Sequence, residues 1–412
     1  MFDIAVVLLV LTALLAYANH RFIGLPGTIG VMAIALILSF ALIGLDKLGL
    51  GQLHDYEVSL LESIDFSDVL MQGMLSVLLF AGAMHVDLSE LRAYRWQVGL
   101  LAVVGTVVST LIVGFALWWF LPLVGIELSL IHCLVFGALI SPTDPIAVMG
   151  ILKSAKAPKN LELVISGESL FNDGVGVVLF SMLLGTIALG TPPTVTQAGT
   201  LLLHEAGGGI VFGLVLGYVT FRLLKSIDNY KVEVLLTLAA VLGGYLLATR
   251  LHVSGPLAMV IAGLVIGNHG RALAMSDKTR AHLDMFWELL DEILNTVLFV
   301  LIGMEALVIP YSPSVGVAAI AAVVITLVAR LLAVGAPVAL FNTRFNLPRG
   351  SWQVLTWGGL RGGISVALAL SLPLSTERNV VLALTYAVVV FSILVQGLTI
   401  GKIARRATRM AP

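Results

Sequence analysis

Long apolar runs follow one another along almost the whole chain. Thirteen of them measure about 17–25 residues, the length that an α-helix needs to cross the hydrocarbon core of a bilayer. The predicted spans are 2–17, 24–44, 66–84, 96–121, 131–152, 162–190, 200–224, 232–249, 253–268, 284–305, 314–341, 351–372 and 379–401. Only 11% of the residues are charged, whereas a soluble domain carries about 25%. The sequence therefore predicts an all-α polytopic membrane protein with thirteen transmembrane helices.

The basic residues of the loops are distributed unevenly between the two sides of these spans. Eighteen Lys and Arg residues fall on the side of the C-terminus, and three fall on the side of the N-terminus. Because short cytoplasmic loops retain Lys and Arg, this bias predicts an outside N-terminus and a cytoplasmic C-terminus in the cell (inner or plasma) membrane. The net charge of −1 excludes the basic character of a nucleic-acid-binding protein.

Two of the predicted spans contain clusters of helix-breaking residues. The fifth span holds Ser141-Pro142-Thr143-Asp144-Pro145, and the twelfth holds Gly358-Gly359-Leu360-Arg361-Gly362-Gly363. Spans 1–6 and 8–13 form two sets of six that start on opposite sides, and each cluster has the same place in its set. We therefore expect two inverted six-helix repeats, in which discontinuous helices 5 and 12 cross at the midplane. Interrupted spans at matching positions are typical of a transporter binding site.

The sixth span carries four polar side chains within six residues. They are Glu168, Ser169, Asn172 and Asp173, and the last three share one helical face. A charge at the bilayer centre costs roughly 2.5–3.5 kcal/mol on insertion scales, so two carboxylates in one span need a role. A polar brace between helices is one interpretation, and a cation or proton site is the one that we favour.

The residues around the two breaks suit an alkali cation. Asp173, Asp144, the Ser169 hydroxyl and the Thr143 carbonyl would supply hard oxygen ligands. Arg361, in the other break, is expected to offset the negative C-terminal ends of the half-helices. The chain has no His/Cys cluster with zinc spacing, and no cofactor is expected.

One further charge, Arg330, lies deep in the eleventh predicted span. An unpaired buried charge is costly, and Glu168 is the most economical counter-charge. We therefore expect a structural Glu168–Arg330 pair, which leaves Asp173 as the titrating group of the sixth span.

At these motifs the chain resembles the first cation–proton antiporter family, of the NhaP and Na+/H+ exchanger type. The stretches that carry the resemblance are 141–148, 167–173, 327–334 and 357–365. The resemblance implies that cation and proton share Asp173, that Asp144, the Thr143 carbonyl and Ser169 complete the ion site, and that Asn172 is their neighbour. One departure is Ala81, which stands where members often carry an acidic residue in the third span.

The resemblance also implies a homodimer and a division into a scaffold and a mobile core. The expected segments are 1–95 (scaffold and dimer helices 1–3), 96–190 (core helices 4–6), 191–305 (scaffold helices 7–10) and 306–412 (core helices 11–13). Beyond the membrane lipid and a second copy, no partner is expected, neither a soluble protein nor a nucleic acid.

The predicted function is electroneutral exchange of a monovalent cation, Na+ or Li+ in preference to K+, for a proton by alternating access. Asn172 cannot titrate, so the sixth span offers one carboxylate for one proton or one cation. A K+/H+ antiporter is the main alternative. An intramembrane aspartyl protease and a cation channel are less favoured, because the chain has neither a Gly-x-Gly-Asp motif nor a Thr-Val-Gly-Tyr-Gly filter. No enzymatic activity is expected.

Overall fold

The computed structural model describes residues 2–47, 73–145, 148–150, 152, 157–189, 199–200, 203–305, 312–341, 345, 347–348 and 350–409. All regular secondary structure in these ranges is helical, which confirms the predicted all-α class. Eight helical segments in the described ranges are long and apolar enough to cross a membrane, and three shorter apolar helices accompany them. Residues 66–72 of the third predicted span and residues 146–147 and 151 of the fifth lie outside the described part.

Each predicted span overlaps at least one described helix, although α17 begins at Asp277 and α24 ends at Arg409, beyond the predicted ends 284 and 401. In the first half they are α1 (Phe2–Ala18), α2 (Gly27–Lys47), α5 (Leu75–Met84), α6 (Leu88–Leu91), α7 (Arg95–Gly99), α8 (Thr106–Phe120), α9 (Leu130–Ile140) and α11 (Lys159–Leu189). In the second half they are α13 (Gly208–Lys225), α14 (Tyr230–Arg250), α15 (Gly255–Val265), α16 (Arg271–Leu273), α17 (Asp277–Glu305), α18 (Pro313–Arg330), α19 (Ala336–Leu340), α21 (Ser351–Trp357), α22 (Gly363–Leu370), α23 (Thr376–Phe391) and α24 (Gly397–Arg409). Short π-helical segments extend several of them, among them Leu100–Gly105 between α7 and α8 and Leu203–Gly207 before α13.

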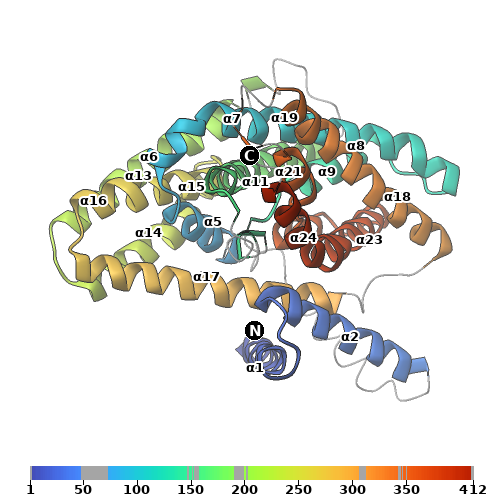
Figure 1. Cartoon of the computed structure of the whole chain (residues 1–412), viewed down its shortest axis with the longest axis horizontal. Helices are drawn as coiled ribbons and strands as arrows, with labels where there is room; N and C mark the ends of the chain where they lie inside the picture. Colours follow the sequence, from blue (N-terminus) through green and yellow to red (C-terminus); the bar gives the residue numbers. More distant parts are fainter. Residues whose placement is uncertain are drawn as a thin grey trace.

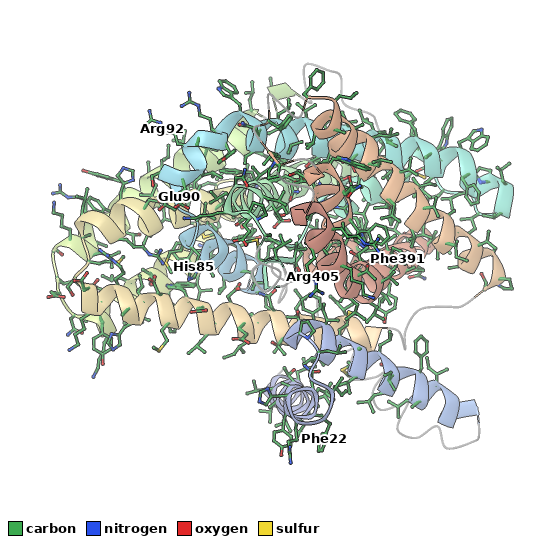
Figure 2. The ribbon with its side chains drawn as sticks, viewed as in Figure 1. Phe22, His85, Glu90, Arg92, Phe391 and Arg405 are labelled. Atoms are coloured by element: carbon green, nitrogen blue, oxygen red, sulfur yellow. The ribbon has the colours of Figure 1, made fainter. Side chains whose placement is uncertain are left out.

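Many large apolar side chains point outward from these helices. Phe22, Trp96 and Leu340 are 76%, 78% and 78% exposed, and Figure 2 shows Phe22 on the outer edge of the molecule. Many exposed large apolar side chains are unfavourable in water and suit a lipid environment. Together with the eight long apolar helices, it is the surface of a multi-pass membrane protein.

The helix α11 occupies the centre of the molecule, whereas α1 and α2 lie at one edge (Figure 1). It packs against α9, α15 and the short helix α7, so its polar face is enclosed by other helices. Gly176 of α11 also lies close to the first break, because a Cβ atom at this position would overlap the ring of Pro142. The central helix therefore lies directly against the first break.

Both predicted breaks are present as interruptions of helical structure. The helix α9 ends at Ile140, and residues 141–145 continue without helical structure. The helix α21 ends at Trp357, and α22 begins at Gly363. The two interruptions meet, because the backbone N–H of Asp144 donates a hydrogen bond of 2.8 Å to the carbonyl of Leu360. Backbone groups that a continuous helix would satisfy internally thus pair between the two segments.

Candidate ion site

The four polar side chains of the sixth span are buried in the centre of the molecule. Glu168, Ser169, Asn172 and Asp173 of α11 are 1%, 2%, 0% and 7% exposed. Asp173 makes no hydrogen bond to another described residue. A carboxylate in this environment is stabilised by binding a proton or a cation, since a lone buried charge is costly.

Thr143 connects this face of α11 to the first interruption. Its hydroxyl shares a hydrogen bond of 2.9 Å with the Ser169 hydroxyl and accepts one of 2.9 Å from the Asn172 amide. Its backbone N–H donates to the Asn172 side-chain oxygen at 3.2 Å. Asn172 therefore holds the unwound chain at two points, and Thr143 is placed beside Ser169.

Asp144 follows at the crossing of the two interruptions and is half-buried. Its carboxylate lies against the backbone of Gly362, where an added Cβ atom would overlap it. Asp144 and Asp173 are near enough for their charges to interact. The structure thus brings Thr143, Asp144, Ser169, Asn172 and Asp173 into one cluster.

Arg361 lies in the second interruption and reaches the first one. Its Nη1 donates hydrogen bonds of 2.6 and 2.9 Å to the carbonyls of Ser141 and Pro142, and the residue is only 2% exposed. These carbonyls follow the C-terminal end of α9, where the helix dipole is negative. The guanidinium therefore supplies positive charge at a helix end, which is the position expected for Arg361.

The expected ion pair between Glu168 and Arg330 is present and bidentate. Arg330 Nη1 binds Glu168 Oε1, and Nη2 binds Oε2 at 2.9 Å. The guanidinium also donates to the carbonyl of Leu355 through Nε at 3.2 Å and Nη2 at 3.1 Å. Both partners are buried, so the pair links α11, the end of α18 and α21 in a low-dielectric interior.

One feature of the surroundings was not anticipated from the sequence. The Ser141 hydroxyl bonds to the Ser109 hydroxyl at 3.0 Å and to the Gly137 carbonyl at 2.7 Å, which secures the end of α9 to α8. Ser109 gave no signal, because single Ser residues are common in membrane helices. Ala81, the departure noted in the sequence, is fully buried in α5, so its methyl group packs in the core at this position.

Comparison with known proteins assigns the chain to a defined class of membrane transport proteins. The family model described as "Sodium/hydrogen exchanger, transmembrane" matches residues 10–406. The chain is 56% identical over 411 residues to the Na+/H+ antiporter NhaP of Pseudomonas aeruginosa, covering 98% of this chain and 97% of that protein. It is 36% identical over 380 residues to the Na+/H+ antiporter NhaH of Halobacillus dabanensis, covering 91% of each.

The fold is also similar to a solved structure. The sodium proton antiporter MjNhaP1 of Methanocaldococcus jannaschii superimposes with a TM-score of 0.76 at 19% identity, covering 97% of both chains. The chain belongs to the sodium/hydrogen exchanger family, whose members are transporters and not enzymes.

Proposed function

We propose that the chain exchanges a monovalent cation for a proton across the cell membrane, with Na+ or Li+ as the favoured cation and K+ as the alternative. Two relatives that it matches over nearly their whole length carry the name Na+/H+ antiporter, which supports Na+ and H+ as the substrates. The exchange proceeds by alternating access, with the same site facing each side in turn.

The observation that carries the proposal is the position of Asp173. It is a buried carboxylate one helical turn after Ser169, and the Ser169 hydroxyl bonds to Thr143 in the first interrupted segment. Asp173, Asp144, the Ser169 hydroxyl and the Thr143 carbonyl are the ligands that we assign to the cation, and oxygen ligands of this kind suit an alkali ion. Asn172 positions Thr143, and proton and cation compete for Asp173.

Three charged residues support the site without binding the ion. Glu168 and Arg330 neutralise each other and join three helices. Arg361 holds the unwound carbonyls of Ser141 and Pro142. We assign these residues a structural role.

For the architecture we propose thirteen spans in two inverted repeats of six, with the interrupted helices 5 and 12 crossing at the midplane. The described ranges hold eight long and three shorter apolar helices. With α17 and the interrupted α21–α22 segment as two further spans, these helices support the number thirteen. We further propose segments 96–190 and 306–412 as the moving core, segments 1–95 and 191–305 as the scaffold, a homodimer, an outside N-terminus and a cytoplasmic C-terminus. The bias of basic residues in the loops supports this orientation.

A proteoliposome assay tests the assignment of Asp173. A pH gradient should collapse when Na+ is added to wild-type vesicles, and Asp173→Asn should reduce this exchange to the level of empty liposomes, because the amide keeps the shape but cannot titrate. Asp277→Asn is the matched control, since Asp277 is fully exposed at the start of α17. Near-wild-type exchange by Asp173→Asn would overturn the mechanism. Flux that is driven by membrane potential without proton movement would indicate a channel, and peptide cleavage would indicate a protease.

A further inference from the structure

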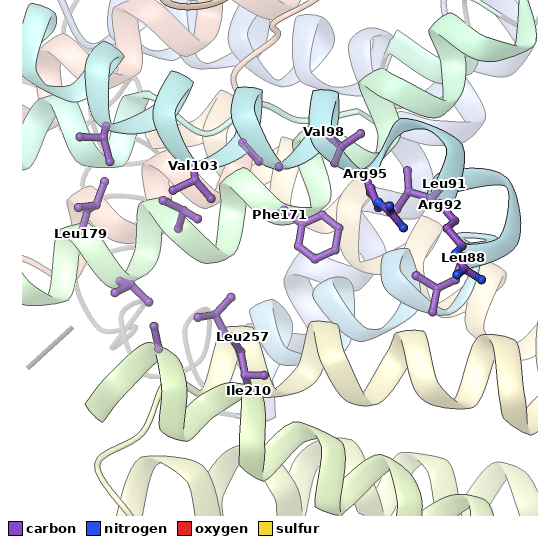
Figure 3. Close-up of a pocket in the computed structure, with 16 residues that line it drawn as sticks. Leu88, Leu91, Arg92, Arg95, Val98, Val103, Phe171, Leu179, Ile210 and Leu257 are labelled. Carbon is purple, nitrogen blue, oxygen red and sulfur yellow. The ribbon is translucent and has the colours of Figure 1, made fainter. Parts of the chain in front are cut away.

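An apolar cavity of about 680 Å³ lies beside α11, and no residue of the ion cluster lines it. One wall comes from α6, α7 and the adjoining segment Leu100–Gly105 together with α11, and the other from α13, α15 and the segment before α13. Figure 3 shows Phe171 in the middle of the cavity, opposite Leu257 and Ile210. The volume falls in the range of about 300–1,000 Å³ that is typical of sites for small organic ligands.

The cavity has a charged end. Arg92 and Arg95 lie beside Leu88 and Leu91 at one end, and Leu179 lies at the other (Figure 3). Both arginines are exposed, and neither forms an ion pair with a described carboxylate. Glu90, which lies near Arg92 in Figure 2, pairs with Lys159 instead. Two cationic groups are therefore available at the mouth of an otherwise apolar space.

We propose that this cavity binds an anionic phospholipid. Its phosphate would bind Arg92 and Arg95, and an acyl chain would extend past Phe171 toward Leu179. Arginine suits phosphate through paired N–H donors. In the orientation proposed above, these two residues lie at the cytoplasmic headgroup level, where anionic lipids concentrate. A free phosphate ion would not need the apolar space, and an uncharged apolar solute would not need the arginines.

The occupied site would connect helices that belong to different parts of the chain. One side of the lipid would contact Phe171 of α11, and the other would contact Ile210 of α13 and Leu257 of α15. A ligand that binds only the folded form raises the apparent melting temperature. This consequence concerns binding alone and does not depend on which ion the protein transports.

The test uses the full-length purified protein with phosphatidylglycerol as the probe. Native mass spectrometry measures retained lipid, and thermal unfolding in detergent measures stabilisation as phosphatidylglycerol or phosphatidylcholine is added. Wild type should retain phosphatidylglycerol, and its melting temperature should rise with phosphatidylglycerol more than with phosphatidylcholine.

The double substitution Arg92→Gln/Arg95→Gln should weaken the apparent affinity for phosphatidylglycerol on the order of tenfold or more. Arg222→Gln/Lys225→Gln is the matched control, because these exposed basic residues at the end of α13 do not line the cavity.

A second variant distinguishes a lipid whose acyl chain occupies the cavity from a lipid that the arginines hold by its headgroup alone. Val103→Trp fills the apolar part and keeps both arginines, so it should also reduce phosphatidylglycerol retention. The proposal is overturned if the control pair weakens binding as much as the arginine pair does, or if Val103→Trp leaves retention unchanged. It is also overturned if soluble glycerol phosphate stabilises the protein as well as phosphatidylglycerol does.

Discussion

At the scale of single residues, Glu168 and Arg330 form a bidentate ion pair that is buried in the centre of the molecule. Glu168 is 1% and Arg330 6% exposed, and the Arg330 guanidinium also donates hydrogen bonds to the carbonyl of Leu355. Burying two charges costs solvation energy, which the paired hydrogen bonds offset only while both partners are present. The pair therefore matters most when one partner is removed.

Arg330→Ala should destabilise the protein by about 3–5 kcal/mol, because it leaves Glu168 as an unpaired buried charge. The apparent melting temperature in detergent should fall further than that of Asp173→Asn. Lys159→Ala is the control, since Lys159 pairs with Glu90 at the surface, where ion pairs contribute little. Equal melting temperatures for Arg330→Ala and Asp173→Asn would show that the pair is not structurally important.

The sequence predicted this pair because both charges lie in apolar spans and few counter-charges are available. It also predicted that Ser169, Asn172 and Asp173 share one face, since the helical period determines this. It did not predict which atoms Asn172 holds. The bonds from Asn172 to Thr143 depend on how closely α11 approaches the first interruption, and that distance is a property of packing between elements.

At the scale of elements, the close approach of α11 to the interrupted fifth span positions the candidate ion site. Gly176 makes this approach possible, because its backbone packs against Pro142, one residue before Thr143. The Pro and Gly clusters predicted where the helices end. The hydrogen bond from Asp144 to Leu360 was not predictable in detail, because sequence patterns do not give the register between two unwound segments.

Gly176→Ala should slow cation/proton exchange and lower the melting temperature. The added methyl group would overlap Pro142, and overpacking of this kind typically costs about 1–3 kcal/mol. Gly185→Ala is a matched control on the same helix, since a Cβ atom at Gly185 meets no atom within 4 Å. The measurement is the initial rate of Na+-induced dissipation of a pH gradient in proteoliposomes. Equal rates for the two variants would contradict the positioning role of Gly176.

At the scale of the whole molecule, the all-α class was predictable from hydropathy, whereas several helix ends were not. The eighth and ninth predicted spans are two separate helices, α14 ending at Arg250 and α15 beginning at Gly255. Hydropathy could not indicate the apolar cavity between α11 and α15. Such a space depends on how tightly the side chains of several helices pack against one another.

The central claim is that one carboxylate, Asp173, binds either one proton or one monovalent cation. Asn172 beside it cannot titrate, so the cycle should move no net charge. We expect one-for-one, electroneutral exchange that does not respond to membrane potential.

The most direct test imposes a membrane potential on proteoliposomes whose cation and proton gradients are balanced. Potassium with valinomycin sets the potential, or a non-transported ion if K+ proves to be a substrate. The account predicts no net cation movement when the potential is applied. Sustained cation movement driven by the potential alone would contradict it and would indicate that Asp144 titrates together with Asp173.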